Sequence, residues 1–165
     1  MVVALRGARG SYPGMIDPAE FPLPRRITRE ARDLVLSLTD MPPGLTLRSD
    51  QKCENVGGDC WERGFDHPRY VVTIQVLRFF TAELAQSYLE TSARSQPGSQ
   101  AMSLGPQLGD SSAAQTKVTD RLATFTIESR VANAVAVVFV GGLLGLDPAV
   151  AVEMAKMQST KLAAP

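Results

Sequence analysis

Alternation of apolar and polar residues from Leu122 to Val131 restricts the fold of this 165-residue chain more than any other feature of its sequence. An extended backbone puts alternate side chains on opposite faces, so one face is apolar and the other polar: Ala123, Phe125, Ile127 and Val131 against Thr124, Thr126, Glu128 and Arg130. We expect a strand with one face on the core and one in water. Ala132-Asn133 favours a turn, because Asn tolerates left-handed backbone, and residues 134–140 predict the returning strand of a β-hairpin.

Helical periodicity appears in three other segments. Apolar residues three and four apart predict a helix over residues 28–38, with Thr28 as its N-cap. A second helix is expected from Thr81 and ends before Pro97-Gly98. Asp147-Pro148 combines an N-cap with a proline at the first helical position, so it predicts the start of a final helix.

Period-two patterns predict further strands. Residues 69–79 form a strong strand, residues 45–47 begin another, and at most a short strand is expected between residues 104 and 118. Strands joined by hairpins, with helices laid on one side, give an α+β fold. We therefore expect an antiparallel sheet of four or five strands with helices packed on it, in a two-layer sandwich.

The length of the chain favours one domain, which we place over residues 27–165. Residues 1–26 hold four prolines and several arginines, and the prolines exclude a helix or a central strand. We interpret this segment as an extended N-terminal arm. No charged, apolar and small-residue signal pattern appears in it, so a signal sequence or a lipid tether upstream is left open.

The only two cysteines, Cys53 and Cys60, flank a short segment that contains Gly57-Gly58. Because glycine takes the positive φ of a tight reversal, we expect the two sulfurs to meet in a disulfide. A disulfide indicates an extracytoplasmic protein, secreted or associated with the cell envelope, although no signal sequence is visible. The alternatives are a metal set completed by His67 and neighbouring acids, or two unpaired thiols.

Acidic and aromatic residues surround the cysteines between residues 50 and 70, a stretch that we interpret as a loop. We expect it to carry a binding surface for a partner or ligand, formed by Asp59, Trp61, Glu62, Phe65, Asp66 and His67. The alternatives are rings that cover the open end of the core and acids that are simply solvated. The acidic spacing does not follow the EF-hand repeat, so no metal site is assigned.

Several other functions find little support in the sequence. Seventeen basic and seventeen acidic residues leave no net charge, so a nucleic-acid partner is not expected. Residues 131–146 are apolar but too few to cross a bilayer. Residues 141–145, Gly-Gly-Leu-Leu-Gly, lack the spacing of a dinucleotide fingerprint. With one histidine and no nucleophile elbow, we assign no catalytic residue and no cofactor.

The residues 31–44 resemble the opening of many secreted or lipid-anchored bacterial α+β domains of unassigned function, in which a short helix runs into Leu-Pro-x-Gly. Residues 124–163 resemble their closing hairpin and helix, with Ala132 in place of the glycine of an Arg-x-Gly-Asn turn. The layout is also similar to PsbP-like proteins and to extracellular sensor domains of bacterial serine/threonine kinases. The resemblance implies an extracytoplasmic domain that binds something, and it transfers no catalytic residue.

Our leading hypothesis is a non-enzymatic extracytoplasmic module that binds a protein partner or a small ligand. An alternative is a structural or assembly subunit whose residues 1–26 pack on a neighbouring chain. A third is a metal-dependent or thiol-based enzyme. The sequence does not identify the ligand, the partner or the oligomeric state.

Overall fold

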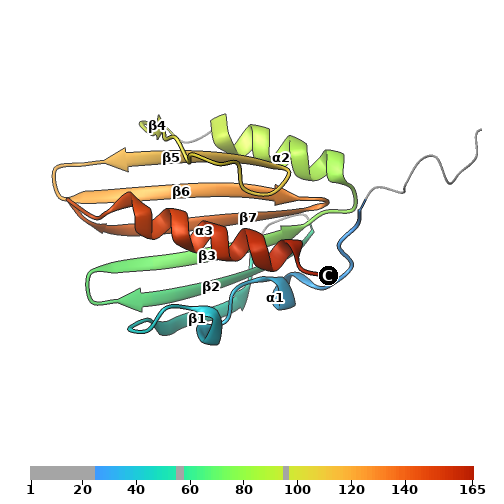
Figure 1. Ribbon diagram of the computed structural model, residues 1–165, viewed down its shortest axis with the longest axis horizontal. Coiled ribbons are helices and arrows are strands. Elements are labelled where there is room, and N and C mark those ends of the chain that lie inside the picture. The colour runs from blue at the N-terminus through green and yellow to red at the C-terminus, as the bar shows by residue number, and fades with distance from the viewer. Residues whose placement is uncertain (1–24, 55–57, 95–96) are drawn as a thin grey trace, which may run out of the picture.

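The computed structural model describes residues 25–54, 58–94 and 97–165, so most of the predicted N-terminal arm lies outside the described residues. The chain forms one antiparallel sheet with helices on it (Figure 1). In chain order the elements are α1 Ala31–Leu34, the 3₁₀ turn η2 Leu38–Asp40, β1 Thr46–Lys52, β2 Asp59–His67, β3 Tyr70–Arg78, α2 Ala82–Arg94, β4 Gln100–Ala101, β5 Ser111–Val118, β6 Leu122–Val131, β7 Ala134–Leu143 and α3 Pro148–Ala163.

The sheet has seven strands in the order β1-β2-β3-β7-β6-β5-β4, and every neighbouring pair is antiparallel. The predicted α+β class is confirmed, whereas the expected number of four or five strands is too small. The predicted hairpin is also confirmed, because Val131 pairs with Ala134 around the two-residue turn Ala132-Asn133. Ala132 has φ +52°, the left-handed backbone that this turn requires.

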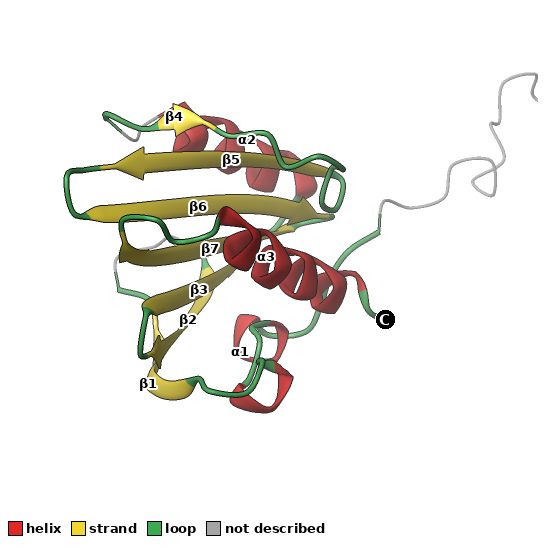
Figure 2. Cartoon of the chain, turned by 60° about the vertical axis from the view of Figure 1, so that its left-hand side comes forward, coloured by secondary structure: helices red, strands yellow, loops and turns green. Residues whose placement is uncertain are grey.

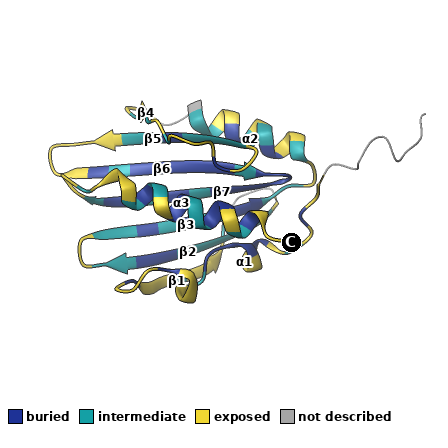
Figure 3. Ribbon diagram, in the orientation of Figure 1, coloured by how far each residue is buried: buried dark blue, intermediate teal, exposed yellow. Residues whose placement is uncertain are grey.

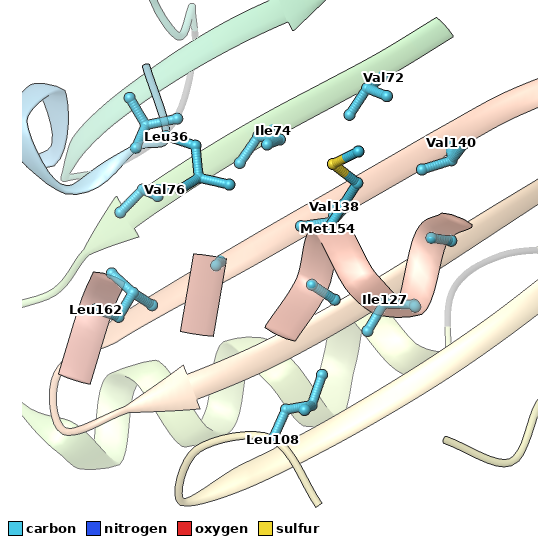
Figure 4. Packing of buried hydrophobic residues seen from close by; sticks show 14 of the residues in the cluster. Leu36, Val72, Ile74, Val76, Leu108, Ile127, Val138, Val140, Met154 and Leu162 are labelled. Atoms are coloured by element: carbon cyan, nitrogen blue, oxygen red, sulfur yellow. The ribbon is translucent and has the colours of Figure 1, made fainter. Parts of the chain in front are cut away.

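The main core lies between one face of the sheet and the helices α1 and α3 (Figure 4). Side chains at alternate strand positions meet apolar residues of α3 there, and each is at most 3% exposed: Val72, Ile74 and Val76 of β3, Ile127 of β6, Val138 and Val140 of β7, and Met154 and Leu162 of α3. This burial accounts for the alternation seen in the sequence of β6.

Helix α2 lies on the opposite face of the sheet (Figure 2). Its Ala85 and Leu89 pack on Val135, whose neighbours Ala134 and Ala136 belong to the main core on the other side. The expected two-layer arrangement with all helices on one side is therefore wrong. Because α2 covers part of the second face, the polar side of β6 does not simply meet water: Glu128 is only 2% exposed (Figure 3 shows burial along the chain).

Three strands were missed wholly or in large part from sequence: β2, the two-residue β4 and most of β5. The stretch assigned as a loop is instead a hairpin of β1 and β2, in which Leu47 pairs with Phe65 and Lys52 with Trp61. Strand β2 lies beside the edge strand β1 and carries polar side chains on both faces, so it shows no clean alternation. Strand β5 has small and polar residues for the same reason, since only the short β4 lies beyond it.

The helix expected over residues 28–38 is much shorter, because α1 has only four residues and the backbone around it is irregular. Its apolar residues are still buried, with Leu34 and Val35 at 0% exposure. The apolar stripe therefore reports burial at Ala31, Leu34 and Val35 but not at Leu38, which is 44% exposed, and it does not report backbone conformation. Residues 27–36, which we call the anchor segment, obtain several of their backbone hydrogen bonds from side chains elsewhere in the chain.

Two buried amide side chains bind the anchor segment. The Ile27 N–H donates to Asn133 Oδ1 at 2.7 Å, and Asn133 Nδ2 donates to Ile27 O at 3.2 Å. The Leu36 N–H donates to Gln158 Oε1 at 2.9 Å, and Gln158 Nε2 donates to Leu34 O at 2.9 Å. Each amide thus pairs with backbone groups that would otherwise be buried without partners.

No helix among the described residues combines the length and hydropathy needed to span a membrane.

We predict that Asn133→Ala lowers the free energy of unfolding by about 3 kcal/mol, because it leaves the Ile27 N–H and the Phe79 carbonyl, at 2.7 Å from Nδ2, without their partner. Gln51→Ala is the control, since the Gln51 side chain is exposed and makes one long hydrogen bond of 3.5 Å. Urea unfolding followed by circular dichroism measures both. A loss for Asn133→Ala no larger than that of the control would contradict the anchoring role.

Candidate ligand-binding pocket

The predicted disulfide is present between Cys53 and Cys60, whose Cα atoms are 5.4 Å apart. It joins the end of β1 to the start of β2, and the Cys53 N–H also donates to Cys60 O at 3.3 Å. Cys60 is 1% exposed. The disulfide therefore links the two strands of the β1–β2 hairpin at the end where the connecting loop joins them.

The two rings expected on the binding surface lie in or against the core. Phe65 has no exposed surface, so its placement on a binding surface is wrong. Trp61 is partly buried against the same core, donates its indole N–H to Asp50 and lies under the Arg32 guanidinium at 5.1 Å. For these residues the alternative reading, rings that cover the core, describes the structure.

The three acids expected on that surface have partners within the fold. Asp59 Oδ2 accepts from the Ala31 N–H at 2.8 Å and from Arg78 Nε at 3.0 Å. Glu62 accepts from Gln75 at 2.6 Å, and Asp66 pairs with Arg48 at 3.0 Å. A binding role for them stays a prediction. Among the described residues, no group of three His, Cys, Asp or Glu side chains is arranged to hold a metal ion.

His67, from the expected surface, lines a pocket. It ends β2 and pairs with Tyr70 across the turn Pro68-Arg69. The His67 and Tyr70 rings stack with their centroids 4.2 Å apart, and His67 Nδ1 accepts from the Arg69 N–H at 3.2 Å. The turn is thus held in one conformation beside the pocket.

This pocket lies at the end of the sheet where the β2–β3 turn meets the start of β6 and the end of β7. Its volume is about 420 Å³, and its walls are mostly apolar: His67, Pro68, Arg69, Tyr70, Val71, Leu122, Thr124, Phe139, Gly141, Gly142 and Leu143. Pockets of this size and character are typical of sites for small apolar ligands.

Of two adjacent glycines, Gly141 leaves the hollow open. A Cβ at Gly141 would lie 3.1 Å from the ring of Phe139 and 3.6 Å from Thr124, so any side chain there would occupy the pocket. A Cβ at Gly142 would lie 2.9 Å from the carbonyl oxygen of Arg69, so this glycine allows the β2–β3 turn to approach β7. The Gly-Gly pair that did not fit a nucleotide loop therefore shapes an apolar recess.

Large apolar side chains are exposed around the same end of the sheet. Leu122 is 49% exposed and Leu143 69% exposed, and Val118 and Leu144 nearby are 60% and 59% exposed. The Leu144 N–H donates to Arg121 O at 2.9 Å, so these side chains stand on a hydrogen-bonded part of the sheet. An exposed apolar cluster of this kind marks a contact site for another molecule.

A second recess of about 330 Å³ adjoins the first. The two share Pro68, Arg69, Tyr70 and Leu143, and the second extends to Asp147 and Val150 at the start of α3. The two recesses therefore adjoin at the β2–β3 turn and the end of β7. Sequence reasoning missed this site, because its walls come from three separate parts of the chain.

Beneath α2, the structure buries a carboxyl that the sequence placed in water. Glu128 Oε1 accepts from Ser92, whereas Glu128 Oε2 is buried with no hydrogen-bond partner among the described residues. Burial raises the pKa of the Glu128 carboxyl above its usual value of 4.5, and the hydrogen bond from Ser92 offsets only part of the shift. Glu128 is not part of the pocket lining, and the hydrogen bond that it accepts from Ser92 joins β6 to α2.

We predict that Glu128 makes folding less favourable as pH rises. A carboxyl whose pKa is raised in the folded state stabilises the fold fully at pH values below its pKa in the unfolded chain, about 4.5. This stabilisation is lost as pH rises through the pKa of the folded state. Glu128→Gln should therefore raise the free energy of unfolding at pH 7 and flatten its decline above pH 4.5. Urea unfolding at several pH values tests this, with Glu90→Gln on the exposed side of α2 as control. Equal pH profiles for wild type and Glu128→Gln would contradict it.

Comparison with known proteins finds little sequence similarity. No protein-family model and no curated protein matches the chain. The crystal structure of the extracellular domain of PknH from Mycobacterium tuberculosis is similar to it, with a TM-score of 0.48 and 16% sequence identity. The match covers 63% of this chain and 63% of that chain, so each is matched over less than two thirds of its length. The expected likeness to bacterial extracellular sensor domains is confirmed to this extent, and it identifies no ligand.

Proposed function

We propose that this chain is a non-enzymatic extracytoplasmic binding module that holds an apolar small ligand in the pocket beside Gly141. The observation that carries the proposal is the recess itself, an apolar hollow of about 420 Å³ left by a glycine in the middle of a row of larger side chains. Glycine weakens the interior of a strand because it has no side chain to pack, and in strands it often marks a place where a ligand approaches the backbone. A ligand in the recess would explain the glycine at position 141.

The pocket walls supply contact area. Val71, Leu122 and Phe139 offer apolar surface, and the stacked His67 and Tyr70 rings form one rim. Burying an apolar group there gains about 25 cal/mol per Å² removed from water. The pocket walls therefore support binding of a hydrophobic group, and we assign no catalytic role to any of their side chains.

An extracytoplasmic location is supported by the disulfide between Cys53 and Cys60. The bond is well placed to stabilise the β1–β2 hairpin, since a crosslink of this loop length contributes roughly 2 to 3 kcal/mol.

We predict that protein isolated from its native host, with free thiols alkylated at lysis, has no free thiol after unfolding without reductant. Titration of the unfolded chain measures this, and a reduced sample of the same protein, which should give two thiols per chain, is the control. Two thiols in the unreduced sample would contradict the extracytoplasmic assignment, because the reducing cytosol keeps cysteines in that state.

We predict that Gly141→Val abolishes binding of the neutral fluorescent probe N-phenyl-1-naphthylamine, with an affinity loss of about tenfold or more. Valine suits a strand, and Gly141 lies in β7 with no positive φ, so the variant should fold with its side chain in the recess. Fluorescence titration measures the dissociation constant.

Thr126→Val is the matched control, since it replaces a hydroxyl group by a methyl group on the same face of the sheet, outside the pocket lining. A second test places charge at the rim: Leu143→Asp, at a residue 69% exposed, should weaken the probe, whereas Phe80→Asp, at a residue 75% exposed and outside the pocket lining, should not. Probe binding that is equal in wild type, Gly141→Val and Leu143→Asp would overturn the assignment of this pocket.

A further inference from the structure

We propose that the ligand of this pocket is a single-chain anionic amphiphile, with its apolar chain against Phe139 and Gly141 and its anionic head at Arg69. This inference rests on the proposed function and goes beyond it by assigning the chemistry of the head group.

The shape of the site favours a molecule with two unlike parts. The first recess, over Phe139 and Gly141, is almost entirely apolar, and the second, toward Asp147 and Val150, is more polar. They meet at Arg69 and Leu143, which line both. A chain that fills the first recess therefore ends beside Arg69.

Arg69 supplies a positive charge where the two recesses meet. The Arg69 side chain is exposed and has no hydrogen bond or ion pair among the described residues. The nearby acids are engaged elsewhere: Asp66 pairs with Arg48 at 3.0 Å, and Asp147 accepts the Ala149 N–H at 2.9 Å as the N-cap of α3. A guanidinium at the mouth of an apolar recess, with no hydrogen-bond or ion-pair partner among the described residues, is complementary to a carboxylate or similar anion.

Within the part of the chain that the structure describes, no acidic residue lines both recesses as Arg69 does. Asp147 lines only the second recess and caps the first turn of α3, and Asp66, paired with Arg48, lines neither. The His67 imidazole is stacked on Tyr70 and uses Nδ1 to accept the Arg69 N–H. The site thus distinguishes head groups by charge as well as chains by hydrophobicity.

The experiment compares three ligands of equal chain length, decanoate, decanol and decyltrimethylammonium, by isothermal titration calorimetry at low salt. We expect decanoate to bind most tightly and the cation most weakly. Arg69→Gln should weaken decanoate about fivefold and leave decanol unchanged, because only the anion contacts the guanidinium. Arg121→Gln is the matched control, an exposed arginine at the same end of the sheet that lines neither recess.

Decanoate binding that is unaffected by Arg69→Gln, or that equals decanol binding, overturns the head-group assignment while the apolar pocket stands. Failure of all three ligands together with N-phenyl-1-naphthylamine overturns the proposed function itself. If the protein sediments with phosphatidylglycerol vesicles but does not bind decanoate, the anion that it recognises is a bilayer lipid. This result would overturn the single-chain assignment.

Discussion

The structure depends on a core segment whose backbone is irregular and therefore needs hydrogen-bond partners from other parts of the chain. The anchor segment, residues 27–36, buries Leu34 and Val35 completely, which takes its peptide groups out of water as well. Asn133 and Gln158 supply buried amide partners, and Arg63 Nη1 donates to Val35 O at 3.0 Å. Without these side chains, the free energy gained by burying the apolar residues would be offset by the cost of burying backbone groups without hydrogen-bond partners.

The β6–β7 hairpin links this anchoring to the candidate site. Asn133 sits in its turn, and Gly141 and Gly142 lie near the far end of β7. The anchor and the pocket are thus at opposite ends of one strand pair in the centre of the sheet (Figure 1). A pocket built on paired strands keeps its shape without a ligand, which reduces the entropy lost on binding.

Several elements were predictable because a single local effect, the burial of alternate strand residues or the capping of a helix, determines each of them. Strands β3, β6 and β7 face the core on alternate residues, and Asp147-Pro148 starts α3 as expected, with the Asp147 side chain accepting from Ala149. Strand β2 was not predictable, because its polar residues pair with β1, β3 and the anchor segment and so obscure the alternation. The helix over residues 28–38 was predicted too long, because the apolar periodicity reflects burial, whereas several backbone groups of this segment form hydrogen bonds with side chains instead of within a helix.

The candidate site was predicted less well than the fold. Of the six residues expected on the binding surface, His67 alone lines the pocket, and Phe65 is in the core. Gly141-Gly142 was visible as a motif, but its meaning depends on Phe139 beside it in β7 and on Arg69 across the β2–β3 turn.

The sequence by itself determined the antiparallel α+β class, the central hairpin, the final helix and the cysteine pair, because each follows from spacing along the chain. Only the tertiary structure decided the number of strands, the placement of α2 on the second face, the burial of Glu128 and the position of the pocket. These depend on which distant segments become neighbours. That choice is made by the packing of the whole sheet and leaves no periodic signal in any single stretch.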